Sequence, residues 1–173
     1  MPFKYYFLNT YVILISMTKT DEMLIRTAIK VAQKANPKDV PIGAVIFTTD
    51  GNELASATNN RESTGDPVGH AEIIAMRKAT STIRKGWRLE GLTLAVTIEP
   101  CMMCVGALVL ARIKRVVFGA WEPKSGAVGS LWDLLRDHRL NHQPEVIGGI
   151  LTNECSLLLK NFFLNRRLSQ FKY

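Results

Sequence analysis

His70-Ala71-Glu72 and, further along the chain, Pro100-Cys101-Met102-Met103-Cys104 are the two stretches around which this sequence is organised. One imidazole and two thiols are ligands of the softness that zinc prefers in proteins. A C-x-x-C spacing at the first turn of a helix puts both sulfurs on one side, close enough for a single tetrahedral ion. The two stretches therefore predict a zinc site made by His70, Cys101 and Cys104.

Three obvious ligands indicate a catalytic site, because a structural zinc normally takes four protein ligands. The open position admits a water molecule, whose pKa a zinc ion lowers from about 16 toward about 7. Glu72 lies two residues beyond His70 and is not needed as a ligand, so we expect it to move protons. Its alternative role is first-turn helix capping. Cys155 lies in an apolar helical pattern and is predicted to be a small buried residue.

The composition is that of an ordinary globular protein, with 173 residues, 47% apolar and 21% charged. Three cysteines, two of them in the C-x-x-C, give no disulfide framework, and a cytoplasmic location is the expectation. The apolar run at 11–15 is too short to span a bilayer. We predict one domain over residues 17–173, preceded at 1–16 by an extension that need not be native, since Met17 directly precedes a helix start.

Strand and helix patterns alternate along the chain. Helices are predicted from Thr20 to Asn36-Pro37, over 71–83, from Pro100 onward and over 153–168, and strands over 42–48, 53–58, 92–97, 116–119 and 145–150. This order is typical of an α/β fold whose sheet is covered by helices on both faces. Residues 59–69 read as a polar loop. Residues 124–130 read as a flexible loop too polar for the core, either a plain connection or a lip beside a substrate.

The net charge of +7 is concentrated near the C-terminus, where four basic residues stand among four aromatic ones without any acid. The residues concerned are Lys160, Arg166, Arg167 and Lys172, with Phe162, Phe163, Phe171 and Tyr173. One interpretation is a helix with a solvated basic face and a buried aromatic face. The other is a surface that binds phosphates and stacks on nucleobases.

From about Met17 to Arg167 the chain resembles the bacterial tRNA-specific adenosine deaminases, within the cytidine deaminase-like superfamily. H-x-E followed by P-C-x-x-C is the signature of zinc deaminases in general. The resemblance to the branch that acts on RNA lies in further motifs. These are Pro41–Val45, Asn59, Asp66-Pro67, Arg115–Ala120, Gly129–Leu131, Asn141-His142, Glu154-Cys155, and Phe162-Phe163 with Arg166-Arg167.

The resemblance implies a three-layer α/β/α fold with a central mixed five-stranded sheet, one Zn²⁺ per subunit, and a homodimer. It implies hydrolysis of the wobble adenosine in a tRNA anticodon stem-loop to inosine, with release of ammonia. His70, Cys101 and Cys104 match the zinc ligands of the family, and Glu72 matches its proton shuttle. Asn59 matches an asparagine that contacts the flipped base. The positions that match contacts with the anticodon loop are Asn141, Phe163 and Arg167.

Two other functions remain open. A deaminase of a free nucleoside, nucleotide or nucleobase, such as cytidine, deoxycytidylate or guanine, would use the same zinc chemistry, but would not need the basic, aromatic C-terminus. A non-catalytic zinc and RNA-binding module would not need Glu72. The chain departs from the family at Gly69, where alanine is common, and at Trp121-Glu122, where Asp or Arg often stands. These departures leave the sequence context of the substrate, and the identity of the tRNA, undetermined.

Overall fold

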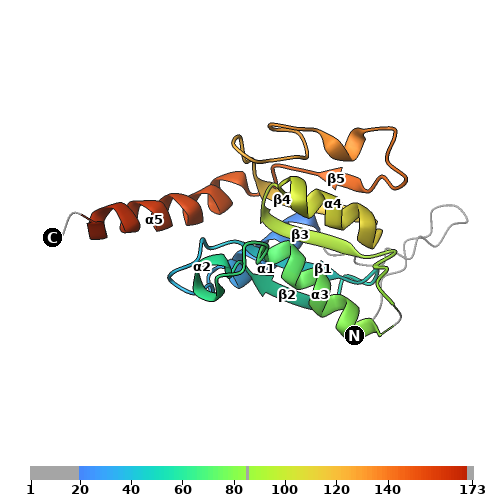
Figure 1. Ribbon diagram of the computed structural model, residues 1–173, viewed down its shortest axis with the longest axis horizontal. Helices are drawn as coiled ribbons and strands as arrows, with labels where there is room; N and C mark the ends of the chain where they lie inside the picture. Colours follow the sequence, from blue (N-terminus) through green and yellow to red (C-terminus); the bar gives the residue numbers. More distant parts are fainter. Residues whose placement is uncertain (1–19, 85, 171–173) are drawn as a thin grey trace, which may run out of the picture.

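The computed structural model describes residues 20–84 and 86–170, so the predicted extension at 1–16 lies outside the described residues. Its centre is a five-stranded sheet of order β2-β1-β3-β4-β5 (Figure 1). β1 is antiparallel to β2 and β3, whereas β3, β4 and β5 run parallel. The strands are β1 (Gly43–Phe47), β2 (Glu53–Thr58), β3 (Thr93–Ile98), β4 (Arg115–Ala120) and β5 (Glu145–Ile147). The expected mixed sheet of five strands is confirmed.

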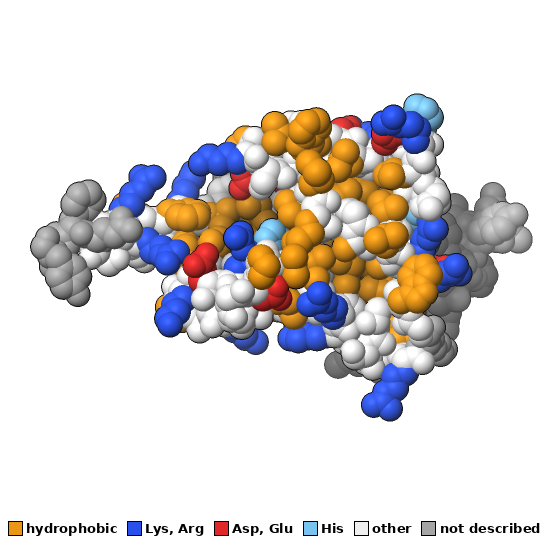
Figure 2. All heavy atoms as spheres, in the orientation of Figure 1, with side chains coloured by type: hydrophobic (Ala, Val, Ile, Leu, Met, Phe, Trp, Pro, Cys, Tyr) orange, Lys and Arg blue, Asp and Glu red, His pale blue; other side chains and the backbone are white. Residues whose placement is uncertain are grey.

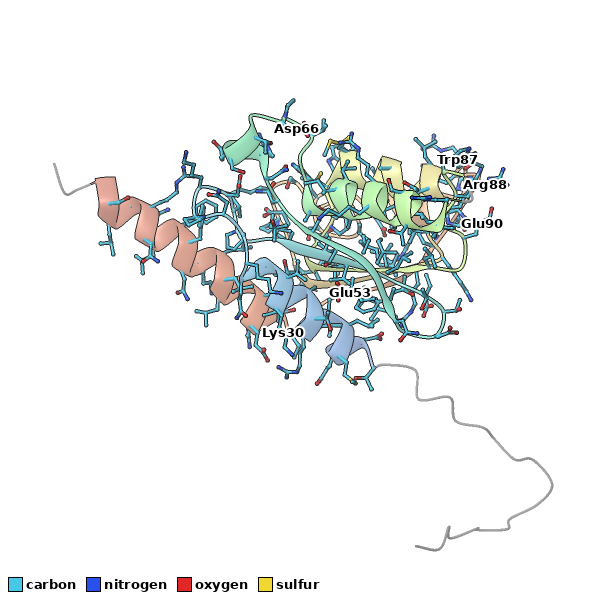
Figure 3. All side chains as sticks on the ribbon, turned by 90° about the horizontal axis from the view of Figure 1, so that it is seen from below. Lys30, Glu53, Asp66, Trp87, Arg88 and Glu90 are labelled. Carbon is cyan, nitrogen blue, oxygen red and sulfur yellow. The ribbon has the colours of Figure 1, made fainter. Side chains whose placement is uncertain are left out.

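Helices cover both faces of the sheet, which confirms the three-layer architecture (Figure 3). Helices α1 (Asp21–Ala32) and α5 (Thr152–Gln170) pack on one face, and α3 (Ala71–Ile83) and α4 (Met102–Ala111) on the other. The central strands are apolar on both faces because both faces are buried, as is typical of sheets between helix layers. Cys155 is 1% exposed in the α1/α5 layer, as predicted.

An ion-pair network closes the edge of the sheet at which β3 and β4 begin. Thr20 caps α1 by accepting a hydrogen bond from the Met23 amide at 3.4 Å. Arg115, the first residue of β4, donates to both carboxylate oxygens of Asp21 at 2.7 and 3.0 Å. Its Nε donates to Glu145 at 3.0 Å. These bonds tie α1, β4 and β5 together at the edge where β3 and β4 begin. Cys101 and Cys104 follow the other end of β3, so the predicted zinc site lies at the opposite edge.

Two predictions about loops are wrong. Part of the predicted loop 59–69 is a short helix, α2 (Arg61–Thr64), whose Glu62 and Ser63 amides donate to the buried Asp39 carboxylate at 2.8 and 3.1 Å. The loop at 124–130 is not too polar for the core, because Ala127 and Val128 are 0% and 1% exposed. The backbone amides of this loop donate hydrogen bonds to a buried acceptor. The polar composition of the loop does not show that such an acceptor is present.

The last elements differ from prediction only in their limits. β5 ends at Ile147 because Gly148 and Gly149 follow, and Gly149 has φ +82, a conformation that ends a regular strand. A Cβ atom on Gly148 would lie 2.3 Å from the Phe118 ring, so glycine permits this close approach. Helix α5 then begins at Thr152. No helix within the described residues is long and apolar enough to cross a membrane.

Candidate active site

The three predicted zinc ligands come together at the beginnings of two helices. His70 and Cys101 are the extended residues that precede α3 and α4, and Cys104 lies in the first turn of α4. Each thiol sulfur is 3.5 Å from the His70 Nδ1 atom. A tetrahedral zinc with bonds of about 2.0 Å to nitrogen and about 2.3 Å to sulfur would hold these atoms about 3.5 Å apart. The three side chains therefore fit a zinc ion as they stand.

The electrostatics of the two thiols suit a metal site. The hydrogen bond from the Cys104 thiol, together with the contact to His70, lowers the pKa of Cys101 to about 4, against the effect of burial. The same bond, together with burial, raises the pKa of Cys104. The pair thus favours a negative charge on Cys101, and a bound zinc ion would favour the thiolate form of both ligands. Both helices also direct their positive ends at this point, which favours negative ligands.

Glu72 lies beside the ligands in the first turn of α3 and is only 3% exposed. Burial raises the pKa of its carboxyl group, against the opposing effects of its own backbone amide and the nearby His70. The Cys104 thiol is a hydrogen-bond partner of this carboxyl group. A carboxyl group with a raised pKa next to a metal site is suited to exchange protons near neutral pH.

Asn59 follows the end of β2 and lies in the segment that borders His70. It is 4% exposed, and its side-chain amide donates to the Val40 carbonyl at 3.4 Å. The next residue, Asn60, donates its backbone amide at 3.0 Å to the carbonyl of Gly69, which precedes His70. A Cβ atom on Gly69 would lie 2.2 Å from the Asn60 Oδ1 atom. A residue with a Cβ atom at this position would therefore require the Asn60 side chain to move.

The three predicted RNA contacts lie away from the zinc ligands within one subunit. Arg112 donates to both the backbone and side-chain oxygens of Asn141 at 2.9 Å. Because Arg112 follows the last residue of α4, this pair is about 15 Å from the ligand end of the ten-residue helix, at a rise of about 1.5 Å per residue. Phe163, 48% exposed, and Arg167 lie on α5, which projects from the body of the protein (Figure 1). Their contact with RNA stays a prediction.

The sequence interpretation missed a second buried acid, Glu99, two residues before Cys101. It is 2% exposed and accepts hydrogen bonds from residues 122, 128 and 130. Burial alone would raise the pKa of Glu99, but the Ser130 hydroxyl and three backbone amides outweigh burial and hold that pKa below its ordinary value. The available signal was a lone acid between a largely apolar, buried strand and Pro100, where an unpaired charge would be costly.

The fold and the ligand geometry are those of a zinc-binding deaminase. Residues 18–120 match the model of the family described as the cytidine and deoxycytidylate deaminase zinc-binding region, and the chain belongs to that family. It is 47% identical over 148 residues to the tRNA-specific adenosine deaminase of Bacillus subtilis (strain 168), which covers 85% of this chain and 91% of the relative. The corresponding protein of Haemophilus influenzae is 43% identical over 148 residues, 85% of each chain. Within the zinc-binding deaminases, the chain is a member of the tRNA-specific adenosine deaminase family.

Solved structures agree with this assignment. A tRNA:A34 deaminase, from a study of A-to-I editing at the wobble position of transfer RNA, superposes with a TM-score of 0.74 at 36% identity, over 79% of this chain and 99% of the other. The guanine deaminase of Nitrosomonas europaea has a TM-score of 0.65 at 18% identity, over 91% of this chain and 96% of the other. At that identity the second likeness concerns the fold alone.

Proposed function

We propose that this protein is a zinc-dependent hydrolase that deaminates the wobble adenosine of a tRNA anticodon to inosine and releases ammonia. The observation that carries the proposal is the three-ligand centre of His70, Cys101 and Cys104 with the buried Glu72 beside it. The names of the relatives at 43% and 47% identity support adenosine in tRNA as the substrate.

A zinc ion held by His70, Cys101 and Cys104 would supply a bound water molecule of lowered pKa. Glu72 takes a proton from the attacking water and delivers it to the ring nitrogen next to that carbon. The same carboxylate then takes a second proton, from the hydroxyl group that has been added to carbon six, and passes it to the departing amine. Water adds to carbon six and ammonia leaves, so the base loses an amine and gains an oxygen. The raised pKa of Glu72 suits this double use.

Asn59 is the proposed contact to the flipped base, because its buried amide lies on the segment that packs against the turn before His70. A base in a stem-loop must leave its stack before water reaches carbon six, and a polar group inside the pocket then holds it. Asn141, Phe163 and Arg167 are the proposed contacts to the rest of the anticodon loop.

Helix α5 offers the chemistry that an RNA loop needs. Phe163 is half-exposed, and its ring meets the Phe162 ring edge to face at 5.3 Å between centroids. The Arg166 guanidinium lies 5.4 Å from the centroid of the Phe162 ring. Exposed aromatic rings stack on unpaired bases and neighbouring cations bind phosphates. A deaminase of free cytidine or guanine has no use for such a projecting surface.

A homodimer is the proposed assembly, with a second copy covering the apolar face of α3 and α4 (Figure 2). This face includes a shallow depression lined by Ile73, Met76, Met103, Ala107 and Leu110. Leu110 is 71% exposed, and Trp87 beside it is 59% exposed. Apolar patches of this kind mark interaction surfaces, and a twofold dimer brings identical patches together.

Sedimentation analysis tests the dimer. Leu110→Glu places a charge in the apolar face and should convert a dimer to a monomer. Leu157→Glu is the matched control, since Leu157 is also an exposed leucine on a helix, 55% exposed on α5, but lies outside the apolar face of α3 and α4. A monomeric unmodified protein would contradict the proposed assembly.

Activity is tested with a tRNA whose anticodon begins with adenosine, and separately with cytidine, deoxycytidylate and guanine. We expect inosine and ammonia from the tRNA alone, loss of activity on chelation of zinc, and recovery when zinc is returned. Turnover of a small substrate with the tRNA unchanged would refute the proposed substrate. A tRNA substrate also makes the cytoplasm the proposed location.

A further inference from the structure

The carboxylate of Glu99 is buried beside the zinc ligands, yet the proposed chemistry does not use it. It lies just beyond the end of β3 and two residues before Cys101, with 2% of its surface exposed. A buried ionised group is costly unless its hydrogen bonds are satisfied, so its partners indicate why it is tolerated.

All of those partners come from one segment, residues 121–130, here called the 121–130 loop. The Oε1 atom accepts from the Val128 and Ser130 amides at 2.9 and 3.0 Å. The Oε2 atom accepts from the Glu122 amide at 3.0 Å and from the Ser130 hydroxyl. Four donors thus converge on one carboxylate, and they fix both ends of the loop.

The same loop packs against the turn that carries Cys101. The Ala127 amide donates to the Pro100 carbonyl at 2.9 Å, and Gly126 forms a β-bridge with Cys101. A Cβ atom on Gly126 would lie 2.2 Å from the Glu99 Oε2 atom and 2.4 Å from its Cδ atom. Glycine is therefore required for the loop to reach the carboxylate and the ligand turn at once.

The outer side of the 121–130 loop is available to a substrate. Trp121 is 48% exposed and meets the buried Phe118 ring edge to face, with centroids 4.8 Å apart. A Cβ atom on Gly129 would lie 3.0 Å from the Trp121 ring, and Lys124 and Ser130 are also exposed. The loop therefore presents an indole held against Phe118, together with the Lys124 cation, at the strand ends near the turn that carries Cys101.

We propose that Glu99 is a positioning residue for substrate binding: it holds the 121–130 loop beside the ligand turn, so that the loop contacts the nucleotides that flank the reacting adenosine. The inference rests on the proposed function of this site. Glu99 itself does not touch the RNA, and it acts through the backbone that it holds. Loss of its bonds should weaken RNA binding while zinc and Glu72 remain in place.

Glu99→Gln keeps the shape of the side chain but gives it one amide group. That NH₂ group must face a pair of donors, so at least one backbone amide loses its acceptor. Ser130→Ala removes a single bond to the carboxylate, and Ser130→Thr keeps the hydroxyl at an exposed position. Ser81→Ala is the matched control, because the Ser81 hydroxyl bonds only within α3 among the described residues.

The experiment measures kcat and KM with an anticodon stem-loop, and zinc content for each variant. Glu99→Gln should raise KM about tenfold and Ser130→Ala about threefold, with kcat within about twofold and one zinc per subunit. Ser130→Thr should restore the KM of Ser130→Ala, and Ser81→Ala should match the unmodified protein. If Glu99→Gln does not fold, the comparison of KM between Ser130→Ala and Ser130→Thr tests the inference.

Two results for Glu99→Gln would overturn the inference: a lower kcat at unchanged KM, or a raised KM accompanied by a loss of bound zinc. In either case Glu99 would support the metal centre and not the substrate-binding loop. Unchanged KM in an active Ser130→Ala protein would also overturn it. An unmodified protein that leaves the adenosine of the stem-loop unchanged would refute the proposed function, and this inference with it.

Discussion

Two acids flank the zinc ligands, and they are almost equally buried but differ in their hydrogen bonds. Glu72, in the first turn of α3, is 3% exposed and has a raised pKa because burial outweighs its favourable contacts. Glu99, after β3, is 2% exposed and has a lowered pKa because four donors outweigh burial. Burial alone therefore does not decide the role of an acid. The number of hydrogen-bond donors around each carboxyl group distinguishes Glu72, the proposed proton carrier, from Glu99, the proposed anchor of the 121–130 loop.

The largest expected effect concerns the proton carrier. Glu72→Gln removes the group that exchanges protons but keeps its volume, so kcat on an anticodon stem-loop should fall by about 10³. Zinc content should stay at one per subunit, because Glu72 is not among the proposed ligands. Glu90→Gln, a change at an exposed acid, serves as the control. Full turnover by Glu72→Gln would show that Glu72 does not carry protons in the reaction.

A smaller effect is expected on stability, and it should appear only at the anchor. Glu99→Gln leaves a buried amide without its acceptor and should lower Tm by about 5 °C, whereas the exposed Glu53→Gln should not change it. Glu72→Gln should leave Tm unchanged or raise it, since burial disfavours the Glu72 charge. Equal losses in both buried variants would show that the donors make no difference.

The anchor should also show a defined pH dependence. The folded pKa of Glu99 lies below its unfolded value of about 4.3, so its stabilising contribution is present above about pH 4.3. That contribution is lost as the pH falls through the folded pKa. In urea unfolding, the difference in unfolding free energy between the unmodified protein and Glu99→Gln should therefore stay constant from pH 7 to about 5 and narrow as the pH is lowered from about 5 to about 3. A gap that widens over this range would contradict the assigned direction.

The smallest expected effect of the two acids is on the salt dependence of tRNA binding, because neither buried carboxyl group is proposed to contact a phosphate. Changing either acid to glutamine should leave the salt dependence of tRNA binding as it is. Arg166→Ala with Arg167→Ala removes two exposed cations of α5 and should reduce the slope of log affinity against log salt by about 1.5. Arg136→Ala with Arg139→Ala, two other exposed arginines, should leave the slope unchanged. An unaltered slope in the α5 variant would mean that its cations face away from the RNA.

The sequence was sufficient to predict the ligands but not the anchor. Cys101 and Cys104 stand three residues apart and Glu72 stands two residues after His70, each pair at a predicted helix start, so these two motifs are visible locally. No short sequence motif marks Glu99, because its hydrogen-bond donors lie 23 to 31 residues further along the chain. Its hydrogen bonds form only when β4 returns beside β3. For the same reason the prediction for the loop at 124–130 is wrong, since its polar composition does not show where its backbone amides donate hydrogen bonds.

The fold shows the same division. Helices and strands follow from local patterns, and their predicted limits were close. The helix α2 was missed because four residues carry no period, and it depends on Asp39, which lies more than twenty residues earlier. The RNA-binding role of Asn141 remains a prediction: the structure shows its partner, Arg112, but one subunit does not bring Asn141 to the zinc ligands.

The placement of the ligands also bears on the order of folding. His70 precedes α3 and Cys101 precedes α4, 31 residues apart, and β3 lies between them in the chain. The closed loop that joins them must form, with β3 seated in the sheet, before one ion can contact all three side chains. Zinc therefore binds a chain that is already largely native. It stabilises that state by mass action.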